Sequence, residues 1–399
     1  MKHFLVFGTH PRLSLAEYRS IRPKLAPPIT VGCAAIVEDK KWDGAWLMQT
    51  LGGTVKLGTI VEEINLTDLD PECFAEIIAS KPRGDEVVFG LTAIGGTTAM
   101  QKRFKKLPLE LKKILKNNGL RCRWVTGKDD GEISPAAVAK LKLTTEGYDF
   151  VCVIHEGKLY IGLTTHVQDA DAWSLRDYGR PMRNDRAGML PPKLARMMVN
   201  MAQIEKGETL LDPFCGNGAV LMEAALASQP GLMIGSDIEE EQTDSCKENL
   251  DWLVKEKILT SDDAKRTNIF PEDVRDLADH IKPSSIDVVV TEGTLGPPLR
   301  GSESKQAIER NAGEVSKLWI DALRTLHPLL KPHARLVIIW PSYKTDGGLA
   351  RVQLDDEMSD LGYAIVNPLA GWDDSGNPLL YHRQGQHVAR RIVVLKKGH

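Results

Sequence analysis

The chain has 399 residues, of which 42% are hydrophobic and 26% charged, and its formal net charge is −3 at pH 7. This length is too great for one ordinary core and predicts two or three domains of a globular protein. No apolar run reaches the roughly 20 residues of a membrane helix, and the first residues lack a signal-peptide pattern, so we expect a cytoplasmic protein with no membrane segment.

The six cysteines are spread along the chain, and none forms a Cys-X-X-Cys pair. This spacing argues against a zinc ribbon and against a secreted disulfide framework, and it favours reduced, mostly buried thiols. No cluster of His and Cys has the spacing of metal ligands, so no metal is expected.

Basic residues gather in one stretch of the chain. Between Lys102 and Lys128 there are ten Lys or Arg against a single acid, Glu110, whereas four of the five residues from Asp237 to Glu241 are acids. Charge asymmetry of this kind indicates a phosphate-binding surface. A solvated basic face with no ligand is the alternative.

Residues 1–58 predict a small α+β unit. FLVFG has the pattern of a strand, and SLAEYRSIR has that of a helix that Ser14 would cap. CAAIVE and AWLMQTLGGTVKLGTIVEEI follow, interrupted by Gly52 and Gly53.

Residues 59–165 continue in the same α+β style. EVVFGLTAI predicts a strand, and YDFVCVIHEGKLYIGLTTHV predicts a hairpin that turns at Glu156 and Gly157. Between them, PLELKKILKNN predicts a basic helix that ends at Gly119, because a left-handed helix end favours glycine.

Residues 166–199 are dense in Arg, Asp and Pro and predict a connector, up to a helix that has Pro191 and Pro192 in its first turn. From there, residues 200–399 alternate short apolar strands with helices. That alternation predicts a parallel, doubly wound α/β sheet.

The most informative segment is TLLDPFCGNGAVLMEAAL, Thr209–Leu226. A strand runs into Asp212, a turn holds Gly216 and Gly218, and a helix follows. Such a turn lies at the carboxyl edge of the sheet, where glycines let a ligand approach the backbone. The next strand ends about 20 residues later at Asp237, which is placed to bind a ribose hydroxyl. A turn without a ligand is the alternative.

A nicotinamide-binding fold is the rival for this turn. Its third glycine is absent, since Leu221 stands there, and the strand ends in Asp-Pro-Phe. An acid at the mouth of the loop would repel a pyrophosphate, whereas it would attract the cationic end of S-adenosylmethionine.

DPFCGNG strongly resembles motif I of the class I amino-methyltransferases, which modify exocyclic amines of nucleobases. The resemblance implies S-adenosylmethionine as cofactor. It assigns the methionine part to Asp212, Phe214, Gly216 and Gly218. It assigns the ribose to Asp237 and the adenine to Asp273, for which a helix cap is the alternative role.

In that family the fourth strand ends in Asp/Asn-Pro-Pro-Tyr, whose oxygens accept hydrogen bonds from the target amine and whose ring stacks on the flipped base. Here the strand is IDVVVTEGTLGPPLRG, so Glu292 takes the acid position, Leu295 the aromatic position and Gly296 the last glycine. Gly293 and Thr294 replace the two prolines. We expect Glu292, Leu295 and Gly296 to form the catalytic loop, with a solvated loop acid as the alternative for Glu292.

The C-terminal LLYHRQGQHVARRIVVLKK resembles the last strand pair of the same domain, with Gly385 at its turn. Tyr381 and Arg383 precede that turn. They would face the substrate, or belong to a plain surface hairpin.

The first half of the chain resembles the ferredoxin-like and THUMP domains of tRNA-modifying enzymes, in LSLAEY, LGGTVKLG, FGLTAIGG, KKILKNNGLRCRWV and ISPAAVAKLKL. The connector WSLRDYGRPMRNDRAGMLPPKLARMMVNMA is close to that of the archaeal and eukaryotic tRNA guanine-N2 methyltransferases. The expected RNA-binding residues are Lys112, Lys113, Lys116, Arg121, Arg123, Arg176, Arg180 and Arg183. For the connector arginines, ion pairs that tie the domains together are the alternative. Phe104 and Trp124 would stack on bases or lie in the core.

These resemblances imply a ferredoxin-like domain over 1–58, a THUMP-like domain over 59–165, and a Rossmann-like methyltransferase domain over 200–399 after the connector. The function they imply is formation of N2-methylguanosine in tRNA near the D-arm, with tRNA as partner and a small activator subunit left open. Two alternatives remain: methylation of another base amine, such as adenine in rRNA or DNA, and an inactive RNA-binding or assembly protein that retains the cofactor fold.

Overall fold

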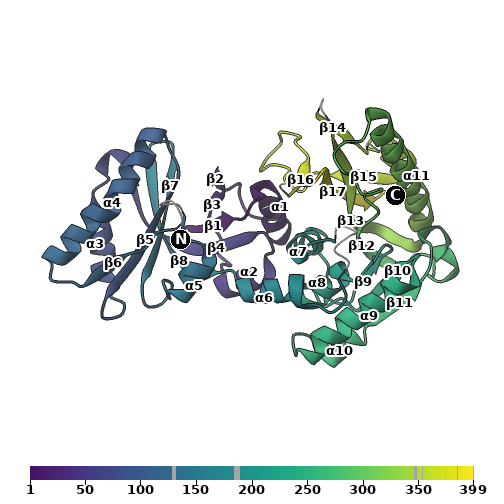
Figure 1. The fold of residues 1–399 in the computed structure, drawn as a ribbon, viewed down its shortest axis with the longest axis horizontal. Coiled ribbons are helices and arrows are strands. Elements are labelled where there is room, and N and C mark those ends of the chain that lie inside the picture. Colours follow the sequence, from purple (N-terminus) through teal and green to yellow (C-terminus); the bar gives the residue numbers. More distant parts are fainter. Residues whose placement is uncertain (128–131, 184–188, 346–347, 353, 384, 399) are drawn as a thin grey trace. The chain divides into compact units, whose positions relative to one another are not determined.

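The computed structural model describes residues 1–127, 132–183, 189–345, 348–352, 354–383 and 385–398. Within these ranges the chain divides into two compact units (Figure 1). Unit 1 comprises Met1–Leu15 and Lys24–Ala172, and unit 2 comprises Ala16–Pro23 and Trp173–His399. No helix in the described ranges combines the length and the apolar character that crossing a membrane requires.

Unit 1 is built on one mixed sheet, whose described strands follow the order β2-β3-β1-β4-β8-β7-β5-β6. The strands are β1 (His3–Phe7), β2 (Ile29–Val31), β3 (Ala34–Val37), β4 (Thr54–Asn65), β5 (Val87–Gly95), β6 (Cys122–Trp124), β7 (Tyr148–His155) and β8 (Lys158–Val167). The helices are α1 (Pro11–Ile21), which continues into unit 2, α2 (Gly44–Thr50), η1 (Leu66–Asp68), α3 (Pro71–Ser80), α4 (Thr98–Asn117), α5 (Pro135–Lys140) and α6 (Ala170–Ser174), which ends in unit 2.

The boundary predicted between 58 and 59 falls inside β4, which pairs with β1 on one side and with β8 on the other. The two predicted N-terminal domains therefore share one continuous sheet. Their division stays a prediction. The boundary predicted between the connector and the next domain, at 199 and 200, falls inside α7 (Pro192–Met201), and it stays a prediction too.

Two helix starts in unit 1 differ from the prediction. α1 begins at Pro11, and the Ser14 hydroxyl donates to the carbonyls of His10 and Gly53 at 3.1 and 2.9 Å, so Ser14 does not cap it. α4 begins at Thr98, with Pro108 inside it. Its apolar face, Phe104, Leu107, Leu111 and Leu115, is buried against the sheet core. That packing outweighs the cost of an interior proline.

Other local predictions for the chain are confirmed. The hairpin of β7 and β8 turns at Glu156 and Gly157, and Gly119 ends α4 with a φ of +78°. Pro191 caps α7 and Pro192 is its first residue. All six cysteines are free thiols, although only Cys152, Cys215 and Cys246 are buried and the other three are half-buried. Lys128, which was counted in the basic stretch, lies outside the described residues.

Unit 2 carries the predicted doubly wound sheet, with described strands in the order β11-β10-β9-β12-β13-β17-β15 and with β14 and β16 at its margin. The strands are β9 (Thr209–Asp212), β10 (Leu232–Asp237), β11 (Thr267–Pro271), β12 (Ile286–Glu292), β13 (Leu330–Thr345), β14 (Gly348–Arg351), β15 (Tyr363–Val366), β16 (Leu379–Tyr381) and β17 (Val388–Lys397). The helices are η3 (Leu175–Gly179), α7, α8 (Ala219–Ala227), α9 (Glu240–Lys255), α10 (Ser261–Ala264), η4 (Val274–Asp279), α11 (Lys305–Leu329) and α12 (Glu357–Asp360).

The strands from β11 to β13 are parallel, whereas β17 runs antiparallel to β13 and β15. The strand order reverses between β9 and β12, which are neighbours in the sheet but not in the chain. In open α/β sheets a crevice opens at such a reversal, outside the carboxyl ends of the strands. The candidate site lies there.

Candidate active site

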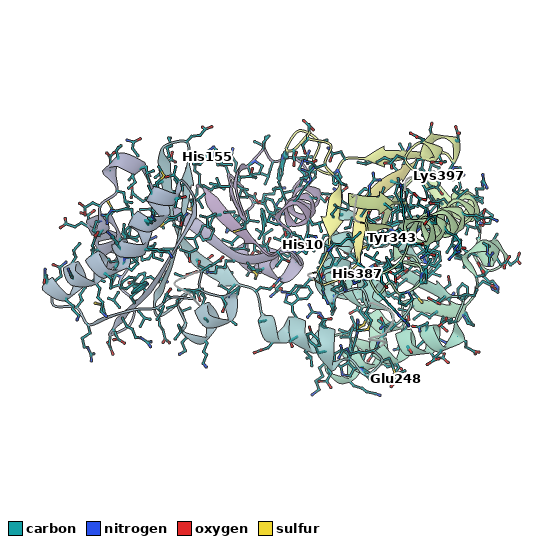
Figure 2. The ribbon with its side chains drawn as sticks, turned by 45° about the horizontal axis from the view of Figure 1, so that its top comes forward. His10, His155, Glu248, Tyr343, His387 and Lys397 are labelled. Atoms are coloured by element: carbon teal, nitrogen blue, oxygen red, sulfur yellow. The ribbon has the colours of Figure 1, made fainter. Side chains whose placement is uncertain are left out.

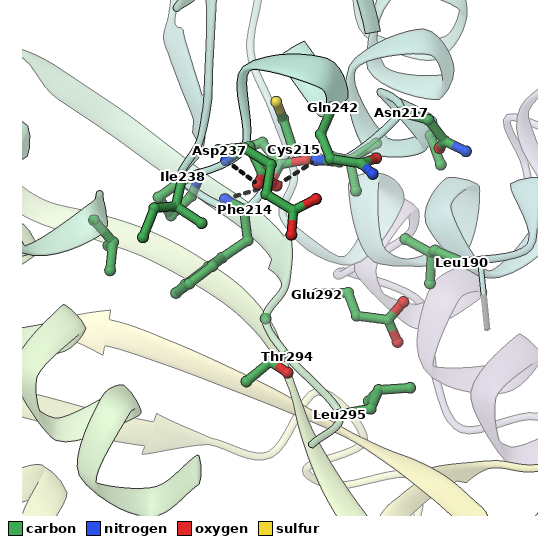
Figure 3. A pocket seen from close by; sticks show the side chains of 18 of the residues that line it. Leu190, Phe214, Cys215, Asn217, Asp237, Ile238, Gln242, Glu292, Thr294 and Leu295 are labelled. Carbon is green, nitrogen blue, oxygen red and sulfur yellow. Dashed lines mark hydrogen bonds between the residues drawn. The ribbon is translucent and has the colours of Figure 1, made fainter. Parts of the chain in front are cut away.

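A pocket of about 680 Å³ lies at the carboxyl ends of β9, β10 and β12 (Figure 3). Every residue predicted for the cofactor site and the catalytic loop lines it, except Gly218: these are Asp212, Phe214, Gly216, Asp237, Asp273, Glu292, Leu295 and Gly296. The fold thus brings together residues that lie up to 84 positions apart, from Asp212 to Gly296.

The loop after β9 has the backbone shape that its glycines predict. Gly216 and Gly218 both have positive φ, +50° and +87°, and Gly218 caps α8. A Cβ on Gly218 would lie 2.5 Å from the sulfur of Cys246, whereas one on Gly216 would meet nothing within 4 Å. Gly218 therefore packs the loop onto α9, and Gly216 leaves the pocket side open.

Asp212 ends β9 and is only 1% exposed. Its Oδ1 accepts hydrogen bonds from the Thr291 hydroxyl at 2.6 Å and from the Phe214 amide at 3.3 Å. Burial raises the pKa of this carboxyl to about 7, although both hydrogen bonds favour its charged form. Thr291, which sequence reasoning missed, joins the end of β12 to the cofactor loop.

Asp237 ends β10 and is half-buried at the pocket. Its Oδ2 accepts from the Gly216 amide at 3.0 Å and its Oδ1 from the Glu239 amide at 3.1 Å. Burial raises the pKa of this carboxyl as well. The two bonds fix the carboxylate between the first two loops of the sheet.

Asp273 has the helix-cap role, and it also lies at the pocket, where its contact with adenine stays a prediction. It caps η4, accepting from the Arg275 amide at 2.9 Å, and it lines the pocket. Its carboxylate also pairs with the Arg275 guanidinium, which lowers the pKa of Asp273.

The loop after β12 is held from behind by two aromatic residues. A Cβ on Gly293 would lie 2.6 Å from the Trp319 ring, so the backbone passes directly over α11. Tyr343 on β13 (Figure 2) donates its hydroxyl to the Leu295 carbonyl at 3.0 Å and lies beneath Gly296, which has a φ of +80°. Burial raises the pKa of Tyr343 to about 12, so the hydroxyl keeps its proton for this bond.

Glu292 points into the pocket, with a side chain that is 12% exposed. Its Oε1 accepts from Nε of Arg390 at 2.5 Å, and its Oε2 lies 3.4 Å from Nη2 of the same guanidinium. Burial raises the pKa of Glu292, and the guanidinium opposes that rise. The alternative of a solvated loop acid is therefore wrong, and Arg390 is a site residue that the sequence pattern did not reveal.

The connector contributes to the cofactor loop. Asn249 on α9 accepts from the Met182 amide at 3.0 Å, and its amide nitrogen donates to the carbonyls of Met182 and Asn217 at 3.0 and 2.8 Å. Asn217 also lies 3.2 Å from the sulfur of Met189, which lines the pocket together with Leu190. The described parts of the connector thus form one wall of the site.

Two of the predicted RNA contacts in the connector lie in the interior of unit 2. Arg176 is 8% exposed and bonds Glu223 at 2.8 Å, and Glu223 also bonds Arg196 at 2.8 Å. Arg180 is 2% exposed. We correct the prediction for Arg176 and Arg180, since buried guanidinium groups cannot reach a phosphate backbone. Arg183 is exposed and lies over the Tyr178 ring at 5.1 Å.

The predicted RNA contacts of unit 1 lie at its surface. On α4, Lys113 and Lys116 are exposed and Lys112 is half-buried. Arg121 and Arg123, which flank Cys122 beside that helix, are exposed too. Phe104 is buried and Trp124 is half-buried against the core, and both border a smaller pocket of about 210 Å³ with Lys105. Their role in RNA binding stays a prediction.

The last strand pair of unit 2, β16 and β17, lies beside Glu292, because Arg390 of β17 bonds it. Tyr381 on β16 pairs in register with Arg390 on β17, and Nε of Arg383 donates to the Tyr381 hydroxyl at 3.0 Å. Gly385 has a φ of +83°, as expected of a turn. No cluster of three or more His, Cys, Asp or Glu among the described residues could hold a metal ion.

Residues 180–353 match the family model of the RMKL-like methyltransferase domain. A tRNA (guanine(10)-N2)-dimethyltransferase of Methanocaldococcus jannaschii is 28% identical over 229 residues, 56% of this chain and 55% of that protein. The chain thus spans about half the length of this curated relative. A Methanothermococcus thermolithotrophicus protein, named as a probable tRNA (guanine(10)-N2)-dimethyltransferase, is 32% identical over 127 residues, 31% of this chain and 74% of that protein. Among solved structures, TrmN from Thermus thermophilus is similar in fold, with a TM-score of 0.54 at 15% identity over the whole of both chains.

Proposed function

The chain belongs to the family of tRNA guanine-N2 methyltransferases, and from this premise we propose that it methylates the exocyclic N2 of a guanosine in tRNA with S-adenosylmethionine as methyl donor. The product is N2-methylguanosine. The names of the relatives specify guanine 10, and we propose the corresponding guanosine, near the D-arm. A cytoplasmic location belongs to the same proposal.

The observation that carries the proposal is the meeting of Asp212, Asp237 and Glu292 at one pocket. They come from the carboxyl ends of three neighbouring strands, at the point where the strand order reverses. Asp212 and Asp237 bond to amides of the loop after β9, on the side proposed for the cofactor, and Glu292 ends β12 before the catalytic loop. Figure 3 shows Asp237 and Glu292 at separate places along the pocket. One pocket can therefore take a methyl donor and a nucleobase together.

The residues of the cofactor side fit S-adenosylmethionine. This donor has a positively charged amino group and sulfonium, and the pocket presents Asp212 and Asp237 to positive charge. Apolar groups from Phe214 and Ile238 line the same wall, as expected for a ligand pocket. A pyrophosphate would be repelled by the same carboxylates. When bound, S-adenosylmethionine would supply an electrophilic methyl group.

Glu292 is the residue suited to orient the target amine. Its carboxylate oxygens accept hydrogen bonds, and an N–H of the amine donated to them would turn the nitrogen lone pair toward the donor side of the pocket. The amine must lose one proton as it gains the methyl group, and a Glu292 oxygen can hold that proton. Because Leu295 offers no aromatic ring, the base would gain apolar contact there but no stacking.

Unit 1 would supply the affinity for tRNA. The exposed cations are Lys113 and Lys116 on α4, Arg123 on β6 and Arg121, which directly precedes β6. Cations of this kind bind phosphates without reading sequence. We propose that they hold the tRNA while the pocket of unit 2 acts on the base, with the THUMP-like and ferredoxin-like units as the RNA-binding half.

The direct test incubates the full chain with methyl-labelled S-adenosylmethionine and unmodified tRNA and then identifies the labelled nucleoside. Label in N2-methylguanosine or N2,N2-dimethylguanosine supports the proposal, and label in another base overturns the choice of guanine N2. Glu292→Ala is expected to lose most of the activity. The matched control is Glu309→Ala, which removes an exposed acid from α11 that is only weakly paired with Lys305 at 3.7 Å.

A second candidate function is an RNA-binding protein that binds the cofactor without transferring its methyl group. The specific observation in its favour is that the loop after β12 carries Leu295 where an aromatic is expected, and that Arg390 already bonds Glu292. Calorimetry of donor binding, combined with the labelling assay, separates the two candidates. A protein that binds the donor but leaves no label in any nucleoside of the tRNA has the second function.

A further inference from the structure

Arg390 is a charged residue near the start of β17, a strand of unit 2. It is 2% exposed, and its partner Glu292 is 98 positions away in the sequence. Burying a charge of this kind is expensive unless it is paired and hydrogen-bonded. The two groups therefore stabilise each other in the interior, next to the pocket.

The sheet register explains how the pair meets. β13 lies between β12 and β17, with Glu292 opposite Ile339 and with Ile392 opposite the same residue. Arg390 lies two residues from Ile392, opposite Pro341, so its side chain passes over β13 to reach the end of β12. Only a side chain as long as that of arginine or lysine spans a strand in this way.

A third contact fixes the plane of the guanidinium. Nη2 of Arg390 lies 3.5 Å from the Met189 carbonyl while it faces Oε2 of Glu292 at 3.4 Å, and Nε bonds Oε1 at 2.5 Å. The fork of a guanidinium matches a carboxylate through two parallel N–H groups. The Glu292 carboxylate is thus held in one orientation before any substrate arrives.

We propose that Arg390 is a positioning residue that fixes Glu292 as a two-oxygen acceptor at the pocket, and that this pair selects guanine over adenine. The proposal rests on the function proposed above and specifies how the same site recognises its base.

The selection follows from the hydrogen-bonding edges of the two purines. Guanine presents two neighbouring donors, N1–H and N2–H, which a carboxylate can accept side by side. Adenine presents the N6–H donor next to N1, which is an acceptor, so one carboxylate oxygen would face a lone pair. A carboxylate has about four lone-pair sites, so the Arg390 bonds leave acceptors free toward the pocket.

The charge of Glu292 determines whether it binds the hydrogen-bonding edge of guanine or that of adenine. The charged groups that face it are Arg390 from β17 and Asp212 from β9, and Tyr343 of β13 lies behind the same loop as a neutral hydroxyl. Burial opposes ionisation of Glu292, and Arg390 favours it. The like charge of Asp212 would oppose it as well. Loss of the guanidinium would raise the pKa of Glu292 further, and a protonated Glu292 would offer an O–H, which fits the adenine edge.

The first test measures kcat/KM for a tRNA whose target guanosine is replaced by 2-aminopurine riboside, which keeps the N2 amine but has no N1–H. The unaltered protein is expected to prefer guanosine by about 10- to 100-fold, the effect of one hydrogen bond to a charged group. Glu292→Gln is expected to lose this preference, because its amide offers one acceptor and one donor. Equal rates on both bases with the unaltered protein would refute the recognition of N1–H.

The second test needs neither donor nor tRNA. The Glu292 carboxyl is titrated by 13C NMR in the full chain labelled at glutamate, with Glu292→Gln identifying its signal. Arg390→Met is expected to raise the pKa of Glu292, and Arg390→Lys, which keeps the charge, is expected to restore most of it. In a separate assay with donor and tRNA, the acidic limb of the pH profile of kcat/KM should move in the same direction in Arg390→Met.

These readouts separate the two proposals. If no tRNA is methylated but Arg390→Met shifts the titration and the protein binds guanosine more tightly than 2-aminopurine riboside, the proposed reaction fails and the recognition pair stands. If methylation of guanosine N2 proceeds but the titration is the same in Arg390→Met and Arg390→Lys, the pair has no positioning role. Circular dichroism of both arginine variants must match that of the unaltered chain. If Arg390→Met unfolds, Arg390→Gln, which also removes the charge, takes its place in the titration.

Discussion

Replacing Asp212 by asparagine is expected to stabilise unit 2 at neutral pH while weakening its hold on the methyl donor. Burial raises the pKa of this carboxyl from 3.8 to about 7. The folded chain therefore binds the Asp212 proton more tightly than the unfolded chain does. The stability that this proton contributes is complete below about pH 4 and is lost as the pH rises through 7.

The size of the effect follows from that shift. A shift of about 3 pKa units corresponds to about 4 kcal/mol of unfolding free energy. About 2 to 3 kcal/mol of that free energy is lost as the pH rises from 5 to 8. Asp212→Asn carries no titrating group at this position. Both hydrogen bonds, from Thr291 and Phe214, reach the same oxygen, which the asparagine carbonyl can replace. The variant should therefore gain stability over the unaltered chain as the pH rises.

Hydrogen exchange of the β9 and β12 amides, read by mass spectrometry and corrected for the intrinsic pH dependence, reports the opening free energy of unit 2. The difference between Asp212→Asn and the unaltered chain should widen by about 2 to 3 kcal/mol from pH 5 to pH 8. Asp244→Asn, at an exposed acid of α9, should show no such trend. A difference that stays constant within about 0.5 kcal/mol, or that narrows, would refute the reasoning.

Three further outcomes are expected. In denaturant unfolding, Gly218→Ala should lose about 1 to 3 kcal/mol of stability, and it should lose most donor affinity, because position 218 has a positive φ and its new Cβ would meet the Cys246 sulfur. Gly216→Ala, whose Cβ would enter open space, should lose at most about 1 kcal/mol in the same measurement. Equal losses in the two variants would contradict the packing argument. Glu223→Gln should lose about 3 to 5 kcal/mol in denaturant, because two buried arginines lose their shared carboxylate; a loss below about 1 kcal/mol would show that the cluster is not stabilising. Replacing Lys113 and Lys116 together by Glu should weaken tRNA binding and flatten its dependence on salt between 50 and 200 mM by about two units of slope; an unchanged slope would remove both lysines from the RNA surface.

Local chemistry made the cofactor loop predictable. A strand, an acid, two glycines and a helix follow one another within 18 residues, Thr209–Leu226, and each imposes its own backbone shape. Asp212, Gly216 and Gly218 therefore lie where the sequence pattern puts them. The hairpin of β7 and β8 was predictable for the same reason, because two adjacent residues, Glu156 and Gly157, form its turn.

What the sequence could not reveal are pairings across long stretches of chain. Arg390 reads as one more polar residue in a strand, and only the sheet order brings it to Glu292. Arg176 reads as a surface cation of a connector, yet Glu223 on α8 draws it into the interior. The start of α4 was misplaced for a related reason, because Pro108 is a strong local signal that packing of the helix face overrides.

The loop after β12 takes its course from Trp319 and Tyr343, which reach its backbone from two other elements. Within the loop, the Thr294 hydroxyl accepts from the Gly296 amide at 3.1 Å, and Leu295 contributes its side chain to the pocket. Proteins can therefore share the backbone path of this loop and differ in its sequence, and a search for the four-residue Asp/Asn-Pro-Pro-Tyr motif would miss them. A search for a distant tryptophan and tyrosine, spaced to support a glycine-flanked acid, would find them.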